Sequence, residues 1–227
     1  MSEAKKVEVL SNAPAGDIEY GLLQREEVPS AARFFVESFQ GRAHAQFGTA
    51  AQAVAFYTDY MDLMRLAHGQ TFFAARTARQ LAGCLLLIMP GQAIFGRLFR
   101  EGFMFRATGH LLSGRYGFSP RFFSRALGAL RGQRGETLRE GLQDVPHIDL
   151  AVVDRAFVGC GIGTRLFELA REACQGRSGK IWLAVDKENT AGIRLFERVG
   201  YRIWRSDSTQ HAMVRDIEQN SAARVLP

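Results

Sequence analysis

The chain has 227 residues with an apolar fraction of 47%, which is enough to build the core of one large domain. Its formal net charge of +6 and its pI near 9.6 favour anionic partners in general but do not bear on the fold. The longest apolar run, LAGCLLLIM at 81–89, is shorter than the roughly 18 residues of a membrane span, so we expect no transmembrane segment.

The N-terminal half predicts one strand, two helices and a hairpin. Residues 1–16 are expected to be flexible, and one domain is expected over 17–217. In chain order we predict a strand at 17–25, a helix opened by Pro29 and running to Phe39, a helix capped by Thr49 and ending at Gly69, and hairpin strands at 71–77 and 81–89.

Residues 91–142 differ in character from the rest. This segment contains nine arginines but only three glutamates, and seven phenylalanines are interleaved with them. Glycine and proline breaks predict two or more short helices rather than one long helix. Arginine with aromatic rings could bind RNA, an acidic protein such as an acyl carrier, or an anionic membrane. Alternatively, the phenylalanines form a small core of their own, beneath a solvated arginine face or as part of a lid over a substrate.

Regular patterns return after residue 142. We predict a strand at 145–153, a helix with an apolar face from Ile162 to Ala173, a strand at 180–186, a helix at 189–200, and a closing hairpin at 201–207 and 210–216. The tail at 218–227 is expected to be disordered.

The stretch VGCGIGTRLFELA at 158–170 places three alternating glycines at the start of a helix. Such a turn presents free backbone N–H groups at the positive end of the helix dipole, which suits a phosphate. A dinucleotide-binding turn requires glycine or alanine where Thr164 stands, and no P-loop lysine is present. A purely structural tight turn is the alternative.

The surrounding sequence resembles the GNAT superfamily of acyl-CoA-dependent N-acyltransferases. HIDLAVVDRAFVGCGIGTRLFELA, followed by IWLAVDKENTAGIRLFERVGYRIW, matches that family's strand, glycine loop and helix, then its second strand, Asn and helix. The resemblance covers about 145–206. It implies an α/β (α+β) fold with a central mixed, mostly antiparallel sheet flanked by helices. Residues 91–142 are then a long helical insertion between the third and fourth strands, where the family has a short connection.

The resemblance also implies where the donor thioester binds. Ala151, Val152 and Val153 would lie where the strand bulges and would offer backbone groups to the pantetheine arm and the thioester carbonyl. Asn189 would hydrogen-bond near the pantetheine or brace the site, with Phe196 beside it. The coenzyme A pyrophosphate would lie on the amides of Gly159, Cys160, Gly161, Ile162, Gly163 and Thr164.

Three positions depart from the family pattern. Val158 replaces the polar or cationic residue that opens the loop. Phe196 replaces the tyrosine that protonates the leaving thiolate in many members, and Ala184 replaces a glutamate base found in some. The usual acid and one usual base are therefore both missing.

His147 and Asp149 are the candidates for a replacement base. They alternate with apolar residues, so we expect them to share one face of their strand. An edge-strand histidine paired with an aspartate for solvation is the alternative. Asp186 and Glu188 are weaker candidates, and Cys160 is expected to be a bystander on the phosphate loop.

Together these features predict a cytoplasmic N-acetyltransferase that transfers an acetyl group from acetyl-CoA to a primary amine of an unidentified acceptor, such as a small molecule, a peptide or an RNA-linked group. No metal is indicated, because three cysteines without metal-ligand spacing read as reduced thiols. The alternatives are a catalytically silent acyl-CoA-binding module and a longer-chain N-acyltransferase. The oligomeric state is open, with a homodimer among the alternatives.

Overall fold

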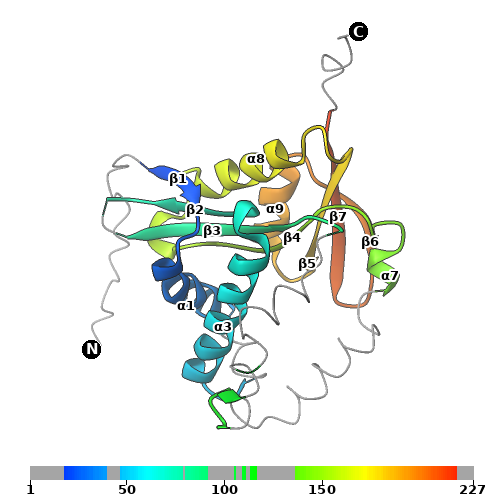
Figure 1. The fold of residues 1–227 in the computed structure, drawn as a ribbon. Coiled ribbons are helices and arrows are strands. Elements are labelled where there is room, and N and C mark those ends of the chain that lie inside the picture. The colour runs from blue at the N-terminus through cyan, green and yellow to red at the C-terminus, as the bar shows by residue number, and fades with distance from the viewer. Residues whose placement is uncertain are drawn as a thin grey trace, which may run out of the picture.

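The computed structural model describes residues 18–39, 47–78, 80–91, 105, 109–110, 113–116 and 136–218. Seven strands in this part of the chain form one sheet, in the order β1-β2-β3-β4-β5-β7-β6 (Figure 1). Neighbouring strands run antiparallel except β4 and β5, which are parallel. The predicted mixed, mostly antiparallel sheet flanked by helices is confirmed.

The elements follow the predicted chain order. The strands are β1 (Glu19–Leu22), β2 (Phe72–Arg76), β3 (Leu81–Ile88), β4 (His147–Val153), β5 (Lys180–Asp186), β6 (Arg202–Ser206) and β7 (Gln210–Asp216). The α-helices are α1 (Val28–Ser38), α3 (Ala50–His68), α7 (Glu136–Arg139), α8 (Ile162–Cys174) and α9 (Thr190–Arg198). Short 3-10 helices lie at η1 (Arg25–Glu27), η2 (Gly69–Thr71) and η3 (Arg155–Phe157). Thr49 caps α3 as predicted, because its hydroxyl accepts the Gln52 N–H at 3.2 Å.

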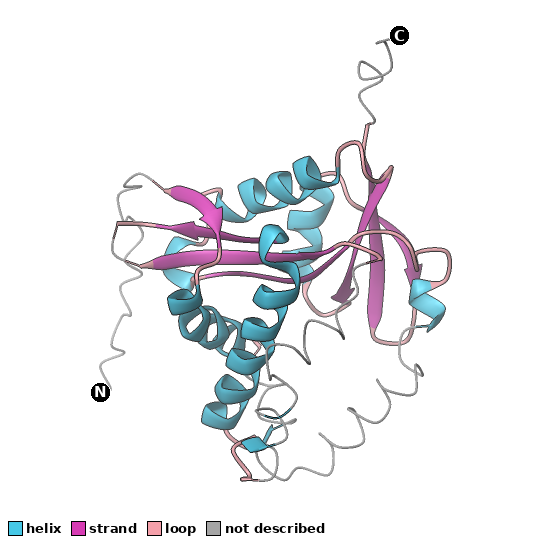
Figure 2. Cartoon of the chain, viewed as in Figure 1, coloured by secondary structure: helices cyan, strands magenta, loops and turns pink. Residues whose placement is uncertain are grey.

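Helices cover both faces of the sheet, which gives three layers (Figures 1 and 2). On one face, α8 and α9 bury a cluster that includes Leu166, Phe167 and Ile181. On the other face, α1 and α3 bury a second cluster that includes Met61 and Phe72. The buried side chains of β3 and β4 are divided between these two clusters, so the sheet separates the two layers of helices.

Most of the predicted insertion at 91–142 lies outside the described residues. Its described end includes α7, and Leu138 and Leu142 there are buried against Trp182 of β5. This end of the connection therefore lies on the same side of the sheet as α3. The tail after Glu218 also lies outside the described residues.

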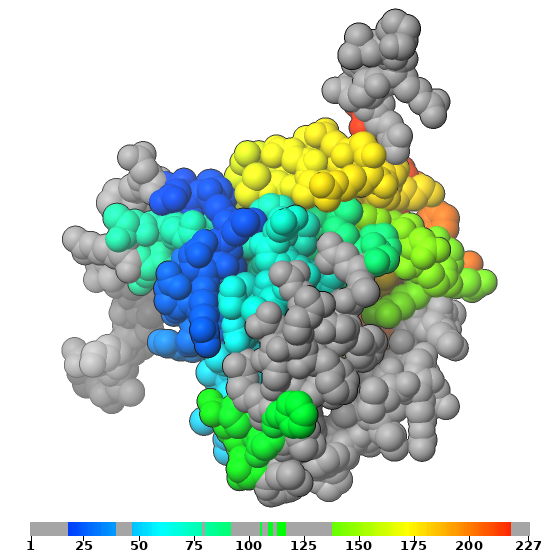
Figure 3. Space-filling view, viewed as in Figure 1, coloured from blue at the N-terminus to red at the C-terminus, as the bar shows by residue number. Residues whose placement is uncertain are grey.

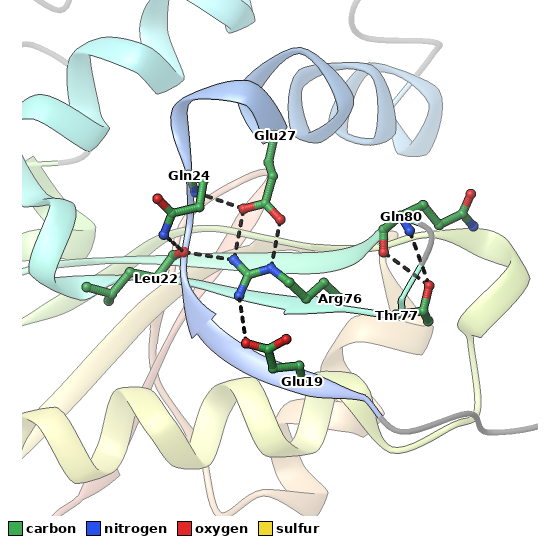
Figure 4. Close-up of polar contacts among 7 residues, drawn as sticks. All are labelled: Glu19, Leu22, Gln24, Glu27, Arg76, Thr77 and Gln80. Carbon is green, nitrogen blue, oxygen red and sulfur yellow. Dashed lines mark hydrogen bonds and ion pairs between the residues drawn. The ribbon is translucent and has the colours of Figure 1, made fainter.

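An ion-pair network joins β1, β2 and the start of α1 (Figure 4). Arg76 holds the Glu27 carboxylate with two hydrogen bonds, of 2.8 and 2.9 Å, and also donates to the Leu22 carbonyl at 2.9 Å. Burial raises the pKa of Glu27. The hydrogen bonds from Arg76 and from the Gln24 N–H together lower it by more than burial raises it, so the pKa lies below its usual value. The network fixes α1 against the sheet edge.

Replacing Tyr201 with phenylalanine is expected to stabilise the protein. Tyr201 is 3% exposed, and its hydroxyl has no hydrogen-bond partner among the described residues. Burial accordingly raises the pKa of this phenol. Its ring packs on Phe167 and Phe196, and those contacts persist in the variant. Because an unsatisfied buried polar group costs about 1–3 kcal/mol, Tyr201→Phe should increase the free energy of unfolding by about 1 kcal/mol in urea denaturation. A loss of stability would contradict this and point to a partner outside the described residues.

Candidate functional site

The two parallel strands, β4 and β5, pair over a short length and then diverge. Their ladder contains the pairs His147–Trp182 and Ile148–Leu183, preceded by a bond from the Trp182 N–H to the Pro146 carbonyl at 3.0 Å. β4 continues to Val153 and β5 to Asp186, and the strands diverge over that length (Figure 2). The β4 edge from residue 149 onward therefore offers backbone donors and acceptors to an extended ligand, as an added strand would use them.

A bulge in β4 lies at the point where the strands diverge. Leu86 of β3 pairs with Leu150 and Leu87 pairs with Ile148, so the register skips Asp149. The bulge implied by the resemblance at 151–153 therefore lies earlier in the strand, because residues 151–153 pair regularly with β3. Since a bulge interrupts the alternation of faces, Ile148 packs under α8 while Leu150 packs under α1 and α3.

Asp149 receives a hydrogen bond from helix α3. The Tyr60 hydroxyl donates to its Oδ2 at 2.5 Å. Burial, followed by the charge and hydrogen bond of Asp149, raises the pKa of Tyr60 well above its usual value, so this phenol stays protonated. Asp149 itself is exposed. Its carboxylate is thus held from the α3 side and is accessible to a substrate.

His147 lies on the same side of the sheet, half-buried against the Trp182 ring, with 5.3 Å between the ring centroids. The Trp182 N–H donates to the Val145 carbonyl at 3.2 Å, which fixes the indole. Burial lowers the pKa of His147; the Asp149 charge opposes this, and repulsion by Arg139 and His68 adds to it. The imidazole is therefore neutral, and able to accept a proton, at lower pH than a free histidine.

The lowered pKa of His147 predicts a pH-dependent stability. An unfolded histidine titrates near about 6.5, whereas the folded one remains neutral to lower pH, so below pH 6.5 the unfolded state binds more protons. The stability contributed by His147 is therefore present above that pH and is lost as pH falls towards the folded pKa. Urea denaturation at pH 7.5 and 5.5 should show a larger loss for the wild type than for His147→Gln. Equal losses would contradict the assignment.

The glycine loop follows β4 after the short 3-10 helix η3 and adopts backbone conformations that favour glycine. Gly159 and Gly161 have φ of +91° and +79°, in the left-handed region. A Cβ added at either residue would have no neighbour within 4 Å among the described residues, so the space beside them is open. Gly163 differs, because a Cβ there would lie 3.3 Å from Leu195 Cδ2. It lets α8 and α9 approach closely.

The first turn of α8 presents unpaired amides beside this open space. Its first intrahelical bond runs from the Arg165 N–H to the Gly161 carbonyl at 3.1 Å, so the amides of 161–164 precede it. The described first turn contains no acidic side chain. Thr164 and the loop from Val158 to Gly161 are exposed, whereas Ile162 is buried in the core. Free amides, the positive end of the helix dipole and solvent exposure are the features that favour binding of an anion.

The remaining residues predicted to contact the acyl donor lie on α9, with Asn189 at its N-cap and Phe196 within it. Asn189 caps α9, because its Oδ1 accepts the Gly192 N–H at 2.9 Å. Phe196 packs on Phe167 at a centroid distance of 5.2 Å. Tyr201 packs on both rings, but its hydroxyl is buried, so it does not supply an exposed phenol in place of the missing tyrosine. Ala184 is exposed on the strand that leaves β4.

The weaker candidates are placed less favourably. Asp186 accepts a hydrogen bond from the Gln210 side chain at 2.9 Å, at the far end of β5. Glu188 is exposed in the turn that follows. Cys160 is exposed on the loop, where its N–H donates to the Phe157 carbonyl at 3.2 Å.

Tyr60 is the residue of this site that sequence reasoning did not identify. Its partner is 89 positions away, so no local pattern connects them. The available sequence signal was Asp59, a charged residue in a helix rich in apolar and aromatic residues. In the structure it is 8% exposed, and a buried carboxylate needs polar partners.

Over the described ranges, no group of three or more His, Cys, Asp or Glu side chains is arranged to hold a metal ion. None of the helices described combines the length and apolarity needed to cross a bilayer.

Comparison with known proteins gives a consistent result. The family model described as Acetyltransferase (GNAT) family matches residues 35–201. The structure of SsHAT shares 15% identity with a TM-score of 0.65, and covers 89% of this chain and 99% of that one. An N-acetyltransferase from Staphylococcus aureus Mu50 shares 15% identity with a TM-score of 0.57, over 86% and 99% of the chains. The PaiA N-acetyltransferase from Thermoplasma acidophilum, solved in complex with coenzyme A, shares 11% identity with a TM-score of 0.52, over 88% and 99%. Curated protein sequences yield no match.

Proposed function

The chain belongs to the GNAT family of acetyltransferases, and from this premise we propose that it transfers an acetyl group from acetyl-CoA to a primary amine. One observation carries the proposal. The β4–β5 ladder ends at Ile148, and the released edge of β4 leads through the short helix η3 to the exposed amides of the glycine loop. An extended edge followed by an anion site matches a ligand with a long amide-bearing arm and a pyrophosphate.

In the proposed complex the backbone of β4 binds the arm. Ala151, Val152 and Val153 pair with β3 on one side, and their other edge faces the gap towards β5. The pyrophosphate binds the loop amides of Gly159 and of residues 161–164, because the Cys160 N–H already donates to the Phe157 carbonyl. Asn189 braces the start of α9 beside them, since its side chain is already used as a cap.

The proposed reaction joins the amine nitrogen to the thioester carbonyl carbon and breaks the carbon–sulfur bond. A proton leaves the nitrogen, and one is added to the thiolate sulfur. Asp149 is the proposed base, because it is exposed at the bulge and held by Tyr60. His147 is the second candidate, since burial keeps it neutral. With phenylalanine at 196, we propose that water protonates the thiolate.

Protein groups contribute to this reaction by position as much as by proton transfer. Holding the two reactants in line lowers the barrier by up to about 7–11 kcal/mol, whereas acid–base assistance contributes roughly 10²–10⁴-fold in rate. The absence of the tyrosine and glutamate of other members at Phe196 and Ala184 is therefore compatible with turnover. We also retain the cytoplasmic location predicted from the cysteines, all three of which are free thiols.

The same two substitutions favour a second candidate function, a module that binds acyl-CoA without turning it over. Release of free thiol from acetyl-CoA separates the two. The purified chain is mixed with acetyl-CoA and a panel of primary amines: a polyamine, an aminoglycoside, an α-amino acid and a peptide with a free N-terminus. Amine-dependent thiol release supports the enzyme. Calorimetric binding of acetyl-CoA with no release from any amine would support the module, and release only from longer acyl-CoA would indicate a longer-chain acyltransferase.

A further inference from the structure

Part of the connection between β3 and β4 is docked on the middle of helix α3. His110 Nδ1 lies 2.7 Å from Asp59 Oδ2, and the Tyr116 hydroxyl donates to the same oxygen at 2.6 Å. Both contacts join positions more than fifty residues apart. Asp59 is 8% exposed and Tyr116 is 5% exposed. In the space-filling view, residues 113–116, in bright green, lie against the helix (Figure 3).

An aromatic path leads from this contact towards β4. The Tyr116 ring meets Phe56 edge-on, with 5.5 Å between centroids. Phe56 lies parallel to Tyr60, at 6.3 Å and an interplanar angle of 10°. Asp59 and Tyr60 follow Phe56 by three and four residues on α3, so each lies about one turn from it and neighbours it on the helix surface. The connection thus contacts the residue that precedes Tyr60 by a turn.

Tyr60 ends the path at Asp149, 2.5 Å from hydroxyl to Oδ2. A hydrogen bond from a neutral donor to a carboxylate is among the stronger kinds, and it restricts the carboxylate to one orientation. Asp149 needs such a restraint, because it stands at a bulge on an exposed edge, where the register of β3 skips it. With Oδ2 bonded to Tyr60, the second oxygen, Oδ1, accepts no hydrogen bond from the described residues and is left for an incoming amine.

We propose that Tyr60 is a positioning residue for Asp149, and that the docked segment at 113–116 holds Tyr60 in place through Phe56. This inference rests on the proposed function, in which Asp149 takes the proton of the amine. It assigns a role to the connection that sequence patterns left open: residues far from Asp149 along the chain set the orientation of its carboxylate.

The test measures thiol release from acetyl-CoA with the fastest amine of the panel. Tyr60→Phe should lower kcat by about ten- to a hundredfold, the range expected when a hydrogen bond to a charged group is lost, and should leave KM for acetyl-CoA unchanged. The same substitution in an Asp149→Asn background should have no further effect on kcat. A purely structural role would lower kcat in both backgrounds. Tyr201→Phe is the matched control, since it removes a buried hydroxyl without a partner among the described residues.

Two variants of Tyr116 test the path. Tyr116→Leu removes the ring that meets Phe56 and should lower kcat several-fold, and this effect should vanish in the Tyr60→Phe background. Tyr116→Phe retains the ring and should have a smaller effect. Near-ultraviolet circular dichroism establishes that each variant folds. If the wild type is active and Tyr60→Phe matches it, the positioning role is overturned while the proposed function stands. If no amine releases thiol with the wild type, the proposed function fails and the inference fails with it.

Discussion

Replacing Gly161 with aspartate is expected to abolish coenzyme A binding while the protein stays folded. The substitution places a carboxylate beside the amides that the pyrophosphate would use, at the positive end of α8. Two unit charges 4 Å apart repel by about 4 kcal/mol at an effective dielectric constant of 20, and solvent exposure reduces this. We expect the affinity to fall at least about a hundredfold, equivalent to about 2.8 kcal/mol, in isothermal titration calorimetry.

Asparagine at the same position separates charge from bulk. Gly161→Asn has the same size and tolerates the φ of +79° equally well, because short polar side chains adopt left-handed backbone more readily than others. It should weaken binding less than the aspartate does. Gly176→Asn controls for backbone strain, since Gly176 has φ of +71° just beyond the other end of α8. Undiminished binding by folded Gly161→Asp would overturn the anion site.

Replacing Asp149 with asparagine is expected to lower kcat by about 100- to 10,000-fold, the range associated with loss of a general base. Asparagine has the same shape, and its carbonyl oxygen can still accept the Tyr60 hydroxyl, so the fold and the KM for acetyl-CoA should persist. Steady-state thiol release measures both constants.

His147→Gln is the comparison that identifies the base. If His147 takes the proton instead, its variant will lose more activity than Asp149→Asn does. An Asp149→Asn enzyme with wild-type kcat would exclude Asp149 as the base and leave His147 or water in that role. Calorimetry with acetyl-CoA on the same samples confirms that each variant still binds the donor.

Local patterns predicted the elements well, for a physical reason. The capping hydroxyl of Thr49, the apolar face that starts at Ile162 and the apolar run along 180–186 are each encoded in a short window of sequence. The glycines at 159 and 161 likewise indicate a left-handed backbone conformation, which the structure contains. A feature can be predicted from sequence where the residues that determine it and the backbone they shape lie in the same short segment.

Features that depend on two distant windows could not be predicted in this way. The bulge at Asp149 is a property of the register between β3 and β4, which no single strand encodes. The Tyr60–Asp149 bond joins segments 89 residues apart. Tyr60 also lies beside the apolar stripe of its helix, so periodicity alone predicts a packing role for it. The candidate donor loop was therefore predictable, whereas the support of the candidate base was not.

The short contact between β4 and β5 has a consequence for the lifetime of the protein. Two residue pairs join the halves of the sheet, and beyond them the gap between β4 and β5 is where the donor arm is proposed to lie. A bound donor then supplies hydrogen bonds that would otherwise come from a neighbouring strand, so it pairs with the free edge of β4 as an additional strand would. Ligand that binds only the folded state stabilises it by RT ln(1 + [L]/Kd), about 2.7 kcal/mol at a hundredfold excess over Kd. The resistance of this protein to heat and proteolysis should therefore rise and fall with the supply of its own substrate.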